Sequence, residues 1–168
     1  MAGRTQSELI GLSATEAVAL LEQGDVSPLE LVDAAEVRIR EVEPSLNALP
    51  TTCFERARGH AEALMRGERS EARGEPGWLG GLPVAIKDLT EVAGVRTTFG
   101  SPIYRDHVPE ESHPVVKRIE RLGGIVIAKS NTPEFGAGGS TFNEVFGRTR
   151  NPWNTALTPG GSTGGGAA

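Results

Sequence analysis

The sequence has only one cysteine, no long apolar run and no apolar leader segment. Each of these three features excludes a class of protein. A single cysteine, Cys53, cannot form an internal disulfide, so a disulfide-stabilised secreted domain is excluded and a reducing compartment is expected. We interpret Cys53 as a small buried hydrophobic residue rather than a nucleophile. No apolar run reaches the ~20 residues of a membrane-spanning helix, and the first residues lack the apolar segment of a secretory signal. We therefore expect a cytoplasmic protein with no membrane partner.

Net positive charge and the motifs of nucleotide and metal sites are missing as well. The 17 basic and 22 acidic side chains leave a formal charge of −5, which argues against a nucleic acid as partner. The glycines near the end of the sequence are not followed by the lysine of a P-loop and contain no G-x-G-x-x-G. His107 and His113 have no companions at metal-ligand spacing, so we interpret them as solvated loop residues. We expect neither a metal nor a cofactor.

A glycine-rich run occupies residues 158–168, TPGGSTGGGAA. Glycine lets backbone N–H groups approach a ligand closely, and successive exposed N–H groups form an anion-binding nest. The two closing alanines favour a helix, so the run reads as a loop that leads into a helix N-terminus. A serine in such a loop, Ser162, suits acyl transfer if a base can reach it; the alternative is a flexible Gly/Ser tail. Because the run stops where a helix would begin, we expect the sequence to be cut within an element.

Residues 13–66 are predicted to be helical. Ser13 and Glu16 form a capping box that starts one helix, and Gly24 ends it. Ser27 starts a second helix with a proline at its first position, and Pro44 is expected to end that helix. A third helix carries an apolar face made of Phe54, Ala57, Ala61 and Leu64. These faces are typical of core packing, so we predict an N-terminal helical arm over 1–66 and a polar, Gly-rich connection over 67–80.

Two short apolar runs, residues 82–86 and 125–128, are predicted to be strands buried on both faces. The helical pattern between them makes a β-α-β unit with parallel strands and places the chain in the α/β class. Lys87 follows the first strand directly, at the position where α/β sheets carry functional residues. The alternative interpretation is a surface ion pair between Lys87 and Asp88, which would contribute little.

Four segments together resemble the amidase signature family of serine hydrolases. They are GLPVAIKD at 81–88, AKSNTPEFG at 128–136, FGRTRNPWN at 146–154 and TPGGSTGGG at 158–166. The resemblance runs from about residue 80 to the end of the sequence, and the helical arm is similar to the family's N-terminal helices more loosely. It implies a mixed-sheet α/β/α fold, of which residues 81–168 would be the first part of a truncated catalytic core.

The resemblance also implies a Ser–cisSer–Lys triad. Lys87 corresponds to the catalytic lysine, and Ser162 to the bridging serine that follows a cis peptide bond. The nucleophilic serine of the family lies some two dozen residues further on, so we expect it beyond residue 168 and the 168-residue chain to be inactive. A lysine acts as a base only when neutral, which requires burial to lower its pKa. Substrate binding is assigned by the resemblance to Gly136, Ala137, Gly138 and Thr163.

The implied function is amide hydrolysis, which converts a small-molecule carboxylic amide to a carboxylic acid and ammonia or an amine. A homodimer is expected for the full-length protein. One alternative is the glutaminase subunit of a tRNA-dependent amidotransferase. The segment NTPEFG is more similar to general amidases, because that subunit typically has MDEF at this place. The other alternative is a non-catalytic fragment.

Overall fold

The computed structural model describes residues 5–68 and 71–168. The described chain forms two compact units, and each unit is built from segments that are distant in the sequence. The first unit contains Met1–Ile39, Cys53–Val84 and Lys117–Ile127, and the second contains Arg40–Thr52, Ala85–Val116 and Ala128–Ala168. The division into 1–66, 67–80 and 81–168 stays a prediction. Arg69 and Ser70 of the predicted connection lie outside the described residues.

Helices begin where the sequence offers a capping box. In α2 (Ala14–Gln23) the Ser13 hydroxyl accepts a hydrogen bond from the Glu16 N–H, and the Glu16 carboxylate accepts one from the Ser13 N–H. Ser27 and Glu30 do the same at the start of α3 (Pro28–Leu46). Both predicted starts are confirmed. The same device opens α1 (Gln6–Ile10), a short helix that the sequence interpretation missed.

The predicted end of α3 at Pro44 is wrong, because this helix continues to Leu46. Proline removes its own N–H from the helix, but later N–H groups still find acceptors. Asn47 N–H donates to the Glu43 carbonyl at 2.8 Å. The Glu43 carboxylate then accepts the N–H groups of the two residues that follow, at 3.0 and 2.8 Å. These bonds satisfy the end of the helix beyond the proline.

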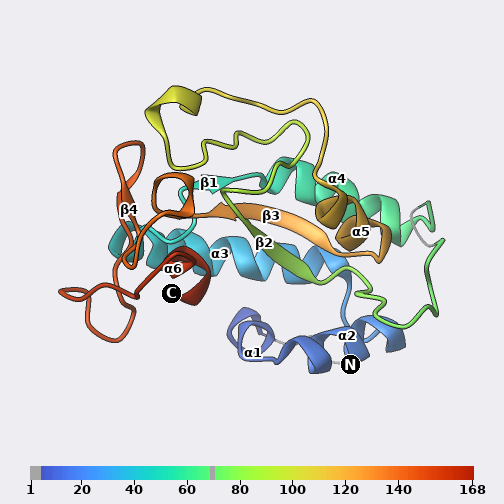
Figure 1. Ribbon diagram of the computed structural model, residues 1–168. Coiled ribbons are helices and arrows are strands. Elements are labelled where there is room, and N and C mark those ends of the chain that lie inside the picture. The colour runs from blue at the N-terminus through green and yellow to red at the C-terminus, as the bar shows by residue number, and fades with distance from the viewer. Residues whose placement is uncertain (1–4, 69–70) are drawn as a thin grey trace. The chain divides into compact units, whose positions relative to one another are not determined.

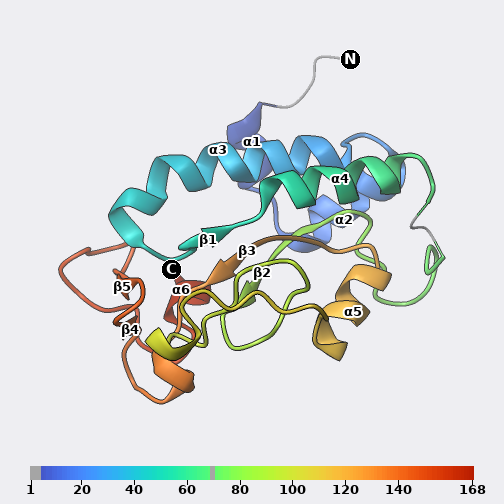
Figure 2. The same ribbon diagram turned by 90° about the horizontal axis from the view of Figure 1, so that it is seen from above.

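The core of the first unit forms around α1, α2 and the start of α3. Its buried members are Leu9, Ala17, Val26, Leu31 and Ala34, and partly buried leucines pack against them. The predicted third helix is α4 (Phe54–Met65), which runs alongside α3 in Figure 2. The two helices are joined by Arg58, which bonds to Asp33 at 2.8 Å and to the buried Glu36.

A sheet with the order β1-β3-β2 is formed by β1 (Thr51–Thr52), β3 (Ile125–Ser130) and β2 (Pro83–Lys87). Figure 1 shows β2 beside β3. The Ile125 N–H donates to the Leu82 carbonyl, and further along the Asp88 N–H donates to the Ser130 carbonyl. The partners follow in the same order on both strands, so the predicted parallel pair is confirmed. The helix between them is α5 (Pro114–Arg121), also as predicted.

Burial differs between the two parallel strands. Every residue of β3 is buried, as predicted for a strand covered on both faces. In β2 the prediction is wrong, because Ala85 is exposed and Pro83, Val84 and Lys87 are only partly buried, which leaves Ile86 as the buried residue of this strand. Within the described residues β2 lies at the edge of the sheet, where a strand keeps one side open.

The second unit consists mostly of loops with short elements in them. They are η1 (Pro102–Tyr104), η2 (Glu134–Gly136), the antiparallel pair β4 (Phe142–Asn143) and β5 (Gly147–Arg148), and α6 (Gly164–Ala167). The glycine-rich run leads into α6 with Gly164 and Gly165 buried, so the flexible-tail alternative is wrong. A bilayer crossing would need a longer or more apolar helix than any found in the described residues.

Candidate active site

Lys87 and Ser162 are in direct contact although they are 75 positions apart in the sequence. Lys87 is the last residue of β2, and Ser162 lies in the loop that precedes α6, after a cis peptide bond from Gly161. The Lys87 ammonium Nζ donates to Ser162 Oγ at 2.8 Å and to Thr163 Oγ1 at 3.0 Å. Burial lowers the pKa of this ammonium. The structure therefore brings together three of the predicted site residues, and the predicted cis bond is present.

Hydroxyl groups hold the loop of Ser162 in place. Thr141 Oγ1 donates to the Gly160 carbonyl at 2.9 Å and accepts the Gly164 N–H at 2.9 Å. The Thr132 hydroxyl donates to the carbonyl of Ser162 itself at 3.2 Å. Both threonines are buried. The sequence interpretation missed them, because an isolated threonine in a loop carries no signal of the partner it will meet.

The glycines of this loop are required by close packing. A Cβ at Gly161 would lie 2.8 Å from the Gly138 carbonyl oxygen and 2.9 Å from the Ser140 nitrogen. A Cβ at Gly165 would collide with the carbonyl oxygen of Ala48 and the nitrogen of Asn131. Glycine accordingly serves here to let backbone approach backbone.

Asn131 connects the end of β3 to the β4–β5 pair. Its side-chain nitrogen donates to the Gly147 carbonyl at 3.3 Å and to Thr149 Oγ1 at 3.1 Å. Its side-chain oxygen accepts from Asn143 Nδ2 at 2.7 Å. Asn131 stands in one of the four recognised segments, but its structural role could not be foreseen from them. The network fixes the surroundings of the Ser162 loop.

Of the predicted substrate residues Gly136, Ala137 and Gly138, Gly138 lies against the loop of Ser162, because a Cβ at Gly161 would lie 2.8 Å from the Gly138 carbonyl oxygen. Gly136 has φ 72°, and a Cβ there would lie 2.6 Å from the Leu89 side chain. Ala137 and Gly138 are exposed, so a small molecule could reach them. Their role in substrate binding stays a prediction.

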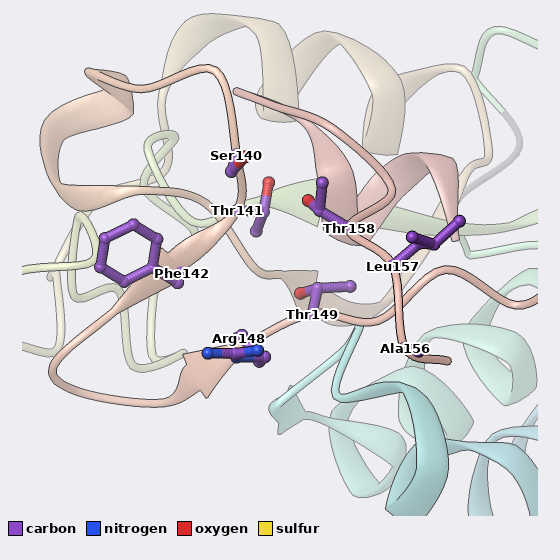
Figure 3. Close-up of a pocket in the computed structure, with 8 residues that line it drawn as sticks. All are labelled: Ser140, Thr141, Phe142, Arg148, Thr149, Ala156, Leu157 and Thr158. Atoms are coloured by element: carbon purple, nitrogen blue, oxygen red, sulfur yellow. The ribbon is translucent and has the colours of Figure 1, made fainter. Parts of the chain in front are cut away.

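A cavity of about 270 Å³ lies near the same loop (Figure 3). The side chains of Thr141 and Thr158 face one another in the view, and Thr141 is also the residue that holds Gly160 and Gly164. The lining consists of Ser140, Thr141, Phe142, Arg148, Thr149, Ala156, Leu157 and Thr158. Lys87 and Ser162 are not among these lining residues.

The interpretation of Lys87 and Asp88 as a surface ion pair is wrong. Asp88 is buried, and its carboxylate binds Lys129, a lysine that the sequence interpretation did not single out. In the part of the chain that the structure describes, no three His, Cys, Asp or Glu side chains are grouped so that they could hold a metal ion. The chemistry that these residues support is proton transfer between an amine and hydroxyl groups.

A family model described as Amidase matches residues 30–168. The chain belongs to the amidase signature family. It is 45% identical to a glutamyl-tRNA(Gln) amidotransferase subunit from Synechococcus sp. (strain CC9605) over 88% of this chain and 30% of that relative. The solved bacterial aryl acylamidase of the amidase signature family has a TM-score of 0.80 at 33% identity, over 92% of this chain and 32% of that one.

The structure of 6-aminohexanoate cyclic dimer hydrolase is similar as well, with a TM-score of 0.78 at 30% identity, over 92% of this chain and 30% of that one. These neighbours bear out the mixed α/β fold of an amidase. The chain spans about a third of the length of the relatives it matches.

Proposed function

We propose that this chain carries the base and the proton relay of an amide hydrolase. The observation that supports this proposal most directly is the 2.8 Å hydrogen bond between Lys87 Nζ and Ser162 Oγ. It is made by a lysine whose pKa is lowered by burial. A lowered pKa increases the share of neutral amine, which is the form that can accept a proton. Membership of the amidase signature family supports the reaction class.

In the proposed mechanism, neutral Lys87 takes the proton of Ser162 Oγ while Ser162 takes the proton of a nucleophilic serine. The nucleophile attacks the amide carbon, and the relay returns the proton to the leaving nitrogen as the C–N bond breaks. Water then hydrolyses the acyl ester, which releases the carboxylic acid and restores the serine. We place the nucleophile outside residues 1–168, so the 168-residue chain alone is inactive.

The proposed substrate is a small-molecule carboxylic amide. Gly136, Ala137 and Gly138 have no bulky side chains, which leaves room for a bulky acyl group on such a molecule. Likeness to an aryl acylamidase and to 6-aminohexanoate cyclic dimer hydrolase supports an amide of this kind. A second candidate is a subunit of glutamyl-tRNA(Gln) amidotransferase with glutamine as the amide, and the 45% identity to such a protein favours it.

The test uses the protein encoded by the complete open reading frame that contains these residues. Ammonia release is measured with glutamine and with an aryl amide such as benzamide. We expect turnover, with Lys87→Ala and Ser162→Ala each losing at least about 10²-fold in kcat. Lys117→Ala, a change at an exposed lysine, is the matched control and should keep the wild-type rate. An active Lys87→Ala enzyme would refute the proposal, and turnover of glutamine alone would select the second candidate.

A further inference from the structure

A second lysine, Lys129, lies completely buried in β3. Its side chain is 0% exposed and that of its partner Asp88 is 1% exposed. Lys129 Nζ lies 3.1 Å from Asp88 Oδ1 and donates a further hydrogen bond of 2.6 Å to Thr97 Oγ1. A buried charge is tolerated only when it is paired and hydrogen-bonded. This ion pair meets both conditions and stands apart from the contact between Lys87 and Ser162.

The Asp88 carboxylate accepts hydrogen bonds from several groups. Asp88 Oδ2 accepts the Thr98 N–H at 3.1 Å and the Thr98 hydroxyl at 2.5 Å. Together with Lys129 these bonds tie the residue after β2 to β3 and to the loop that contains Thr97 and Thr98. Removing one partner would leave a buried charge uncompensated, so the group is held as a unit.

Lys87 and Asp88 direct their side chains to different partners although they are neighbours in the sequence. Lys87 is the last residue of β2, and Asp88 begins the turn that follows it. The pairing of β2 with β3 continues through Asp88, whose N–H donates to the Ser130 carbonyl at 3.0 Å. The Lys87 side chain reaches Ser162, whereas the Asp88 side chain reaches Lys129. Because the two residues are adjacent, a change in the backbone at Asp88 would also move Lys87.

We propose that Asp88 and Lys129 are positioning residues for the amide hydrolysis, because their ion pair locks the end of β2 so that Lys87 Nζ meets Ser162 Oγ. The inference rests on the proposed function. It also divides the tasks of the two lysines. Lys129 is paired with a carboxylate, whereas the bonding partners of Lys87 are neutral hydroxyls. We therefore assign the proton transfer to Lys87 alone.

The chain suits a direct test because it has only three lysines: Lys87, Lys117 and Lys129. Trace labelling with acetic anhydride across a pH series, followed by mass spectrometry, gives the titration of each amine in the 168-residue chain. In the wild type we expect Lys87 to titrate below the exposed Lys117 and Lys129 to remain unlabelled. In Asp88→Asn, Lys129→Met and the double variant, we expect Lys87 to titrate close to Lys117.

Circular dichroism first establishes that each variant is folded. The double variant removes both buried charges at once, which is the change most compatible with folding. Thr97→Val is the mildest change, since it keeps the shape and removes only the hydroxyl that binds Lys129. Glu91→Gln, which neutralises another carboxylate of the same loop, is the matched control and should leave the Lys87 titration unchanged. If the charge variants unfold, the Thr97→Val titration decides.

The outcomes separate the two proposals. Wild-type Lys87 titrating together with Lys117 would overturn the proposed function. Wild-type Lys87 titrating below Lys117, and keeping that titration in folded Asp88→Asn or Thr97→Val, would overturn the positioning role alone. In the protein encoded by the complete open reading frame, we expect Asp88→Asn to lower kcat with little change in KM. A misplaced catalytic group costs on the order of 10²-fold.

Discussion

The hydroxyl of Thr141 lies 2.9 Å from the backbone nitrogen of Gly164, and through this bond the β4–β5 region holds the loop of Ser162. The same hydroxyl donates to the Gly160 carbonyl on the other side of the loop. One buried side chain therefore spans both ends of the turn that contains the proposed relay serine. The consequences for stability and for the reactivity of Lys87 can be measured.

Thr141→Val should lower the free energy of unfolding by about 1–3 kcal/mol, because it leaves the Gly164 N–H and the Gly160 carbonyl without their partner. Urea denaturation of the 168-residue chain measures the change. Thr155→Val, at an exposed position, is the control and should shift the midpoint very little. Equal midpoints for the two variants would show that the Thr141 bonds contribute nothing.

Gly165→Ala should destabilise the fold by about 1–3 kcal/mol, because the added methyl group would collide with the backbone of Ala48 and Asn131. Backbone atoms cannot rotate away as a flexible side chain can. Gly139→Ala is the matched control, since nothing lies within 4 Å of a Cβ at that position. Thermal unfolding followed by circular dichroism compares the two. A Gly165→Ala protein as stable as Gly139→Ala would contradict the packing argument.

The stability of the wild type relative to Lys87→Met should increase with pH. Burial lowers the pKa of Lys87 in the folded protein, whereas the unfolded value is ~10.4. Between these two pKa values the unfolded chain binds more protons, so stability rises with pH through that window. Urea denaturation at intervals from about pH 7 to pH 10.5 measures the difference between the two proteins. A difference between the two proteins that stayed constant across this pH range would rule out a lowered pKa of Lys87.

Lys87→Arg should damage catalysis as much as Lys87→Ala, with a loss of at least about 10²-fold in kcat. Arginine can still reach toward Ser162, but a guanidinium does not give up its proton near neutral pH. The assay is ammonia release by the protein encoded by the complete open reading frame. If Lys87→Arg retained activity while Lys87→Ala lost it, Lys87 would act as a fixed positive charge and the proton-transfer role would be wrong.

Much of the local structure could be predicted because it depends on residues a few positions apart. Ser13 and Ser27 start their helices through hydrogen bonds to the glutamate three positions further along the chain. Because the two residues of each pair are so close in the sequence, the pair can be recognised from the sequence alone. The continuous apolar run 125–128 is a buried strand for a similarly local reason. At Pro44 the local rule failed, because Glu43 supplies acceptors that let the helix continue.

Contacts between distant segments depend on how the chain folds back, and the spacing of residues does not encode them. Lys87 and Ser162 could be named from family resemblance, but their 2.8 Å contact is made by the parallel sheet and the packed glycine loop. Asp88 and Lys129 are 41 positions apart and carry no motif that pairs them. Burial in one sheet makes each the necessary partner of the other, because a lone charge there would be too costly.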